Sequence, residues 1–163
     1  MTLHNIPPLY CAQSRILILG SFPSVKSREG RFFYHHPQNR FWRVMAAVLR
    51  EPVPVTVEEK TALLLRRGVA LWDVAAACEV TGSSDSSIQN VVPNDIACIL
   101  ETAPVRAIFC NGQTAFRLYQ IHLLPVLGRE AAVLPSTSPA NAAWSLERLT
   151  AAWSAALLPV LEV

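Results

Sequence analysis

The sequence lacks any long apolar run. No stretch approaches the roughly 18 consecutive apolar residues that cross a bilayer as a helix, so we expect no membrane partner. The N-terminal residues, MTLHNIPP, lack a basic region followed by a hydrophobic one, which is the pattern of a secretory signal peptide. These two absences predict a soluble protein that works in the cytoplasm.

Charge is also scarce, because only 16% of the 163 residues are charged whereas 52% are apolar. This ratio excludes intrinsic disorder, which requires low hydrophobicity and high charge. The length matches one domain with a substantial core, and we interpret residues 1–163 as that single domain. An interior this apolar is typical of a sheet that is buried on both faces.

Cysteine is present, but its pattern argues against a metal site. The four cysteines occupy positions 11, 78, 98 and 110, and no pair has the close spacing that lets one loop hold zinc or an iron–sulfur cluster. Disulfides are rare in the cytoplasm. We expect the cysteines to be small buried hydrophobic residues, and we expect no metal and no other cofactor.

The positive charge is concentrated in one segment, residues 26–50. It holds six basic side chains and one acidic one, a balance of +5, which leaves −3 for the rest of the chain. The same segment contains five aromatic residues and two histidines. Basic residues interleaved with aromatic ones suit a surface that neutralises phosphates and stacks on bases. A solvated basic loop over a hydrophobic helix is an equally good interpretation.

Four short apolar runs predict the strands of a parallel sheet, at 15–20, 68–73, 105–110 and 131–134. Helical patterns lie at 39–49, 56–67, 94–103, 112–122 and 143–157, and a capping-box pattern opens the second of them. Strands that alternate with helices form a parallel sheet covered on both faces. We therefore predict an α/β fold, a three-layer α/β/α sandwich around a mostly parallel sheet of four strands.

In such sheets ligands bind beyond the carboxyl ends of the strands. The first predicted strand runs into Gly20-Ser-Phe-Pro-Ser24, which is not a P-loop because no Gly-Lys-Ser/Thr follows. Asp73 ends the second strand, where a charge rarely lies without a partner or a function. Asn111 follows the third strand, and the proline-stiffened loop 134–141 follows the fourth. The serine-rich segment 82–87 is predicted to be a flexible loop beside this site.

Each of these features also has a plain interpretation. Gly20–Ser24 can be an ordinary strand-to-helix turn, and Asn111 with the glycine after it can be a tight turn before a helix. Asp73 can cap a neighbouring helix. No single feature therefore identifies a function.

Taken together, the blocks resemble a known family. His36-Pro-Gln-Asn-Arg-Phe-Trp42 follows Gly20–Ser24 and precedes Leu134-Pro-Ser-Thr-Ser-Pro-Ala-Asn141, and this order and spacing resemble the uracil-DNA glycosylase superfamily. The resemblance is closest to its hypoxanthine-DNA (deoxyinosine) glycosylase branch, and it extends from about Arg15 to Asn141. It implies an α/β/α sandwich and an enzyme that removes a damaged base from DNA.

The resemblance implies a catalytic role for Asn39. Many relatives carry an Asp or Asn in the segment matching Gly20–Ser24 to activate water, but here Phe22 stands at or near that place. In the hypoxanthine branch the asparagine of the His-Pro-x-Asn-x-Phe-Trp block takes over, and here that is Asn39. An amide is a poor base, but its oxygen can hold a water below a cationic sugar, where positioning can suffice. The competing interpretation of Asn39 is a cap for the helix that follows.

The resemblance also implies a set of substrate-binding residues. Tyr34 occupies the region where relatives stack an aromatic ring on the extruded base. Asp73 stands where uracil-specific relatives carry the Asn that reads the pyrimidine edge. Because an ionised carboxylate only accepts hydrogen bonds, we expect Asp73 to turn the pocket from uracil towards a deaminated purine. The remaining predicted members of this set are Gly20, Ser21, Phe22 and Asn111.

Two segments are expected to contact DNA. The loop after the fourth strand matches the family loop that pinches phosphates and fills the gap left by the base. The family's catalytic histidine is absent there, with Leu134 or Thr137 nearby instead. The predicted DNA-binding residues are Ser24, Lys26, Arg28, Arg31 and Arg40 in the first half of the chain, and Ser136, Ser138, Pro139, Ala140 and Asn141 in this loop.

The resulting hypothesis is a monomeric DNA glycosylase whose partner is DNA containing deaminated bases, with hypoxanthine preferred and uracil and xanthine as further candidates. Such an enzyme flips its target nucleotide out of the stack and hydrolyses the N-glycosidic bond with water. Neither of the two lysines, Lys26 and Lys60, lies in a motif, so we expect no Schiff-base lyase step. Two alternatives stay open. One is a non-catalytic binder of nucleotides or damaged DNA, and the other is a hydrolase of free nucleosides, which would not need the basic segment.

Overall fold

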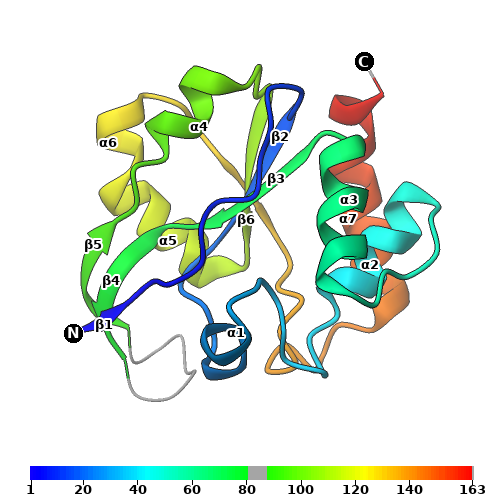
Figure 1. Cartoon of the computed structure of the whole chain (residues 1–163), viewed down its shortest axis with the longest axis horizontal. Helices are drawn as coiled ribbons and strands as arrows, with labels where there is room; N and C mark the ends of the chain where they lie inside the picture. The colour runs from blue at the N-terminus through cyan, green and yellow to red at the C-terminus, as the bar shows by residue number, and fades with distance from the viewer. Residues whose placement is uncertain (81–87, 163) are drawn as a thin grey trace.

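A four-stranded parallel sheet runs through the centre of the molecule (Figure 1). The computed structural model describes residues 1–80 and 88–162, so the segment predicted as a flexible loop, 82–87, lies outside the described residues. The strands are adjacent in the order β3, β2, β6 and β7, and all three pairings are parallel. They comprise β2 (Ile16–Gly20), β3 (Val69–Asp73), β6 (Ala107–Asn111) and β7 (Ala132–Leu134). All four predicted strands and their parallel arrangement are confirmed.

Helices cover both faces of this sheet, which confirms the predicted three layers (Figure 1). Alternate residues of β2 divide between two cores, because successive side chains of a strand point to opposite faces. Ile16 and Ile18 belong to one core, and Leu17 and Leu19 belong to the other. The first core lies under α2 (Phe41–Leu49), α3 (Val57–Arg66) and α7 (Leu146–Leu161), and the second lies under α4 (Ala97–Thr102), α5 (Gln113–His122) and α6 (Leu124–Leu127).

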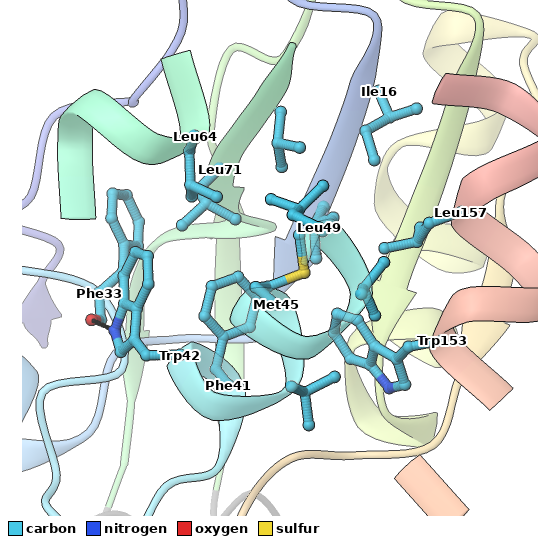
Figure 2. Packing of buried hydrophobic residues seen from close by; sticks show 14 of the residues in the cluster. Ile16, Phe33, Phe41, Trp42, Met45, Leu49, Leu64, Leu71, Trp153 and Leu157 are labelled. Atoms are coloured by element: carbon cyan, nitrogen blue, oxygen red, sulfur yellow. Dashed lines mark hydrogen bonds between the residues drawn. The ribbon is translucent and has the colours of Figure 1, made fainter. Parts of the chain in front are cut away.

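Aromatic packing fixes the helix that follows the His36–Trp42 block. Figure 2 shows Phe41 and Met45 of α2 facing Trp153 of α7. The rings of Phe41 and Trp153 meet edge to face with their centroids 5.8 Å apart, and both side chains are fully buried. Trp153 also donates its indole N–H to the carbonyl of Pro135, at 2.9 Å. The start of α2 and the loop after β7 are therefore held by the same core.

A second, smaller sheet was not predicted. It is antiparallel, in the order β1 (Thr2–Leu3), β4 (Ala75–Glu79) and β5 (Gln89–Pro93). β4 is alanine-rich and β5 contains asparagine and proline, residues that are depleted in strands. The pattern that identifies a buried strand is therefore missing from both. The short helix α1 (Val25–Gly30) was also not predicted.

The structure also describes the cysteine thiols, the lengths of the helices and the side chains that could bind a metal ion. All four cysteines are unpaired thiols, with Cys78 and Cys110 buried and Cys11 and Cys98 half-buried. Burial raises the pKa of the Cys110 thiol to about 12, so it stays protonated at neutral pH. Within residues 1–80 and 88–162, no helix is long and apolar enough to cross a membrane. No group of three or more His, Cys, Asp or Glu side chains in the same residues could hold a metal ion.

Candidate active site

The predicted segments meet at one cavity beyond the carboxyl ends of the central strands. The cavity has a volume of about 290 Å³ and is lined by three chain segments, within 20–27, 33–39 and 136–140, and by two further residues at strand ends. Its walls contain backbone turns, hydroxyls, two amides, one carboxylate and three aromatic rings. The lining residues are Gly20, Ser21, Phe22, Pro23, Ser24, Ser27, Phe33, Tyr34, His36, Asn39, Asp73, Asn111, Ser136, Thr137, Ser138, Pro139 and Ala140.

The predicted catalytic residue, Asn39, and all six predicted substrate-binding residues line this cavity. So do Ser24 and four of the five residues that were predicted to contact DNA from the loop after β7. The remaining predicted residues, Lys26, Arg28, Arg31, Arg40 and Asn141, do not line the cavity. Asn141 lines a neighbouring groove of about 500 Å³, which also contains Ser136, Ser138 and Ala140. The roles of these residues in binding and catalysis stay predictions.

Gly20 makes room for Asp73 in the wall of the cavity. The two residues lie side by side, because β2 and β3 pair with Gly20 opposite Asp73. A Cβ atom at position 20 would lie 2.3 Å from Asp73 Oδ1 and 3.3 Å from the Tyr34 hydroxyl. A glycine is therefore needed at the end of β2, because the carboxylate occupies the space that any other side chain would take.

The carboxylate of Asp73 pairs with a histidine that the sequence analysis did not select. His4 Nε2 lies 2.8 Å from Asp73 Oδ2, and the exposed fractions of the two side chains are 3% and 7%. His4 Nδ1 accepts a hydrogen bond from the backbone N–H of Ile6, at 3.1 Å. The alternative interpretation of Asp73 as a helix cap is wrong, since its partner is an imidazole ring.

Asn39 belongs to a hydrogen-bonded chain that crosses the cavity wall. Its Oδ1 accepts from the backbone N–H of Phe41 and from the hydroxyl of Thr137, both at 2.9 Å. Asn111 holds Thr137 from the other side, with Nδ2 donating to the hydroxyl at 3.0 Å and Oδ1 accepting from the Thr137 N–H at 3.1 Å. These partners fix the orientation of both amide groups. The N-cap of α2 is Arg40, and it makes no side-chain cap hydrogen bond, so the interpretation of Asn39 as the N-cap is wrong. Asn39 instead holds the N–H of Phe41 from one position earlier, and it lines the cavity at once.

Thr137 is the centre of this chain and is fully buried. No role was predicted for Thr137, which lies near the expected position of the family's catalytic histidine. Its nearest signal in the sequence is a hydroxyl inside the Pro-Ser-Thr-Ser-Pro loop. In the structure that hydroxyl connects the amides of Asn39 and Asn111.

Aromatic rings form a further wall. The Tyr34 ring stacks on Phe41, with centroids 4.1 Å apart and planes at 17°. Tyr34 has a left-handed backbone, with φ of 51°, which is uncommon outside glycine and often marks a functional site. Phe22 lies edge-on to the His4 ring, and the Arg28 guanidinium stands 5.4 Å from the centre of the Phe22 ring.

The basic segment divides into structural and exposed side chains. The Arg40 guanidinium donates to the backbone carbonyls of Ser138 and Asn141, both at 3.0 Å, and to that of Trp144. Arg40 therefore holds the loop after β7 in place, and its contact with DNA stays a prediction. Lys26 lies on the surface 3.9 Å from Glu29, and Arg31 is exposed at the end of α1.

Ser24 has a structural function as well as a place in the cavity. Its side chain accepts from the backbone N–H of Ser27 at 3.1 Å and caps α1. The hydroxyl of Ser27, which is buried, in turn accepts from the N–H of His35 at 3.1 Å. These contacts connect the turn after β2 to the segment that carries Tyr34.

Known proteins are similar to this chain over nearly its full length. A family model described as the Uracil DNA glycosylase superfamily matches residues 7–161. A hypoxanthine DNA glycosylase from Methanosarcina acetivorans is 35% identical over 150 residues, which cover 91% of this chain and 94% of the relative. A hypoxanthine DNA glycosylase from Methanosarcina barkeri is 30% identical over 158 residues, covering 96% and 98%. The solution NMR structure of a candidate uracil DNA glycosylase from Methanosarcina acetivorans matches with a TM-score of 0.82, at 35% identity over 98% of both chains.

Proposed function

Because the chain belongs to the Uracil DNA glycosylase superfamily, we propose that it is a DNA glycosylase that excises deaminated bases, hypoxanthine above all. The observation that carries the proposal is that Asn39 and Asp73 line one cavity with the stacked ring of Tyr34. A flipped base needs an aromatic face, a polar group for its edge and a group beside the sugar. The names of the two curated relatives support hypoxanthine as the base.

In the proposed mechanism the flipped base enters the cavity with its ring against Tyr34 and its N1–H directed at Asp73. The bond between C1′ and the base breaks, and its electron pair leaves with the base. A water held by Asn39 then forms the new bond to C1′ and releases its proton to solvent, which leaves an abasic site. Asn39 Oδ1 accepts from Phe41 and Thr137, and these two hydrogen bonds orient the amide group that holds the water.

A lyase step is not part of the proposal. Burial lowers the pKa of Lys60, as a Schiff-base lysine requires, but its ammonium lies 5.3 Å from the centre of the Trp42 ring. Lys26, the other lysine of the chain, is exposed beside Glu29. Neither lysine lines the cavity.

The test is excision from labelled duplexes that contain inosine, uracil or xanthine, followed by alkaline cleavage of abasic sites. We expect cleavage of the inosine strand with alkali and none without it. Binding to the damaged duplex without excision would instead identify a non-catalytic module. Hydrolysis of free inosine in the absence of duplex excision would identify a nucleoside hydrolase.

A further inference from the structure

The N-terminal segment brings a histidine to Asp73 in the wall of the cavity. β1 pairs with β4, with Leu3 opposite Ala77, and the His4 N–H donates to the carbonyl of Ala76 at 2.7 Å. Further along, the carbonyl of Ile6 accepts from the indole N–H of Trp72 at 3.1 Å. His4 is therefore anchored on both sides, directly beside the end of β3.

The hydrogen bonds of His4 determine which nitrogen carries its proton. Nδ1 accepts from the backbone N–H of Ile6, so Nδ1 is unprotonated and the ring proton resides on Nε2. Nε2 therefore donates to Asp73 Oδ2, at 2.8 Å. The carboxyl group of Asp73 is therefore held at Oδ2 by this ring.

The other oxygen of the Asp73 carboxyl group lies against Gly20. Asp73 Oδ1 lies over the Cα of Gly20, where a Cβ would be only 2.3 Å away. Both residues line the cavity. With Oδ2 held by His4, Oδ1 is the oxygen of this carboxylate that remains for a base.

We propose that His4 is a positioning residue for base recognition, which orients Asp73 so that Oδ1 accepts the ring N–H of the flipped base. This inference rests on the proposed function. Hypoxanthine has a proton on N1 and donates it to such an acceptor. Adenine, its parent base, has a lone pair on N1, which an accepting oxygen repels. His4 thereby helps the pocket to distinguish the deaminated base from the normal one.

Two substitutions separate this function from simple anchoring of the N-terminal segment. His4→Gln places an amide N–H near the position of Nε2, so it can still donate to Asp73. His4→Asn places an oxygen near the position of Nδ1, so it can still accept from Ile6 but does not reach Asp73. We expect His4→Asn to lower single-turnover excision of inosine by about 10- to 100-fold, the range for a lost hydrogen bond to a charged group. We expect His4→Gln to stay within about 3-fold of wild type, because the charged hydrogen bond is retained.

A double-mutant cycle and a spectroscopic measurement complete the test. In an Asp73→Asn background, His4→Asn should cause little further loss, because the two residues act as a unit. Equal losses in His4→Gln and His4→Asn, or additive losses with Asp73→Asn, would overturn the proposal. In wild type, ¹⁵N NMR of the imidazole should show a protonated Nε2 and an unprotonated Nδ1, and the opposite tautomer would also overturn it.

Assays of wild type and of His4→Asn distinguish an error about His4 from an error about the proposed function. A wild-type protein that excises no deaminated base refutes the function, whatever the tautomer of His4. A wild-type protein that excises inosine, together with a fully active His4→Asn variant, refutes only the function of His4. Urea unfolding of each variant shows that the compared proteins are folded.

Discussion

Replacing Asn39 by alanine should abolish most excision while leaving the protein folded. The substitution removes the oxygen that accepts from the Phe41 N–H at the start of α2 and from the Thr137 hydroxyl. It also removes the group that we propose to hold the attacking water. The two consequences differ in kind, because one lowers stability and the other raises the barrier to reaction.

The structure sets the size of each effect. Loss of the acceptor for the Phe41 N–H at the start of α2 should cost about 0.5–1.5 kcal/mol of unfolding free energy. The fully buried Thr137 hydroxyl loses its acceptor, which should cost about 1–3 kcal/mol more. A domain with a stability of about 5–15 kcal/mol remains largely folded after such a loss. We expect excision to fall by about 100-fold or more, the scale for one key polar group in an active site.

Single-turnover excision of inosine, measured beside urea unfolding, tests this reasoning. Asn39→Asp is the matched control, because its carboxylate can accept from both Phe41 and Thr137. We expect Asn39→Asp to keep the stability of wild type and to excise much faster than Asn39→Ala. Binding of the damaged duplex should change little in either variant. If folded Asn39→Ala excises at nearly the wild-type rate, Asn39 only holds the start of α2 and has no part in the mechanism.

Four further substitutions test other parts of the site. Asp73→Asn should shift the ratio of inosine to uracil single-turnover rates towards uracil by about 1–3 kcal/mol; equal loss of both activities would contradict a specificity role. Arg31→Ala should reduce the slope of log affinity against log salt concentration by about one. Arg50→Ala should leave the slope unchanged and is the matched control, because Arg50 ends α2 with the same left-handed backbone (φ of 57° against 53° for Arg31). Equal slopes in the two variants would mean that Arg31 does not contact phosphate. Gly20→Ala should displace the carboxylate and lower inosine excision at least about 10-fold, and unchanged kinetics would show that the wall can adapt. Thr137→Val should lower excision much more than Thr137→Ser, which keeps the hydroxyl, and equal rates would remove this hydrogen bond from the mechanism.

The parallel sheet could be predicted because its strands carry a local signal. β2 is a continuous run of buried residues that ends in glycine. β3 is a similar apolar run, in which Trp72 is half-buried and Asp73 stands at the end. Burial on both faces imposes such runs, and the carboxyl ends of parallel strands meet at one edge. The positions of Asn39, Asp73 and Asn111 around one cavity follow from this topology together with the family resemblance.

His4 could not be predicted, because its importance depends on a contact with a residue 69 positions away in the sequence. It lies ahead of the first predicted strand, in a segment with two prolines and no periodicity. The strand that holds His4, β4, is alanine-rich, and its sequence does not predict a strand. Without β4 there was no reason to expect residues 2–4 to run back to the end of β3.

The net charge of the basic segment does not show that one of its arginines has a structural function. The guanidinium of Arg40 is directed at three carbonyls of the loop after β7, and the Arg40 N–H donates to the carbonyl of Thr137 at 3.1 Å. The residue directly after Asn39 thus clamps the loop whose threonine orients Asn39. At least one charge of this segment therefore stabilises the geometry of the proposed water site, so the salt dependence of DNA binding should reflect fewer phosphate contacts than the balance of +5 implies.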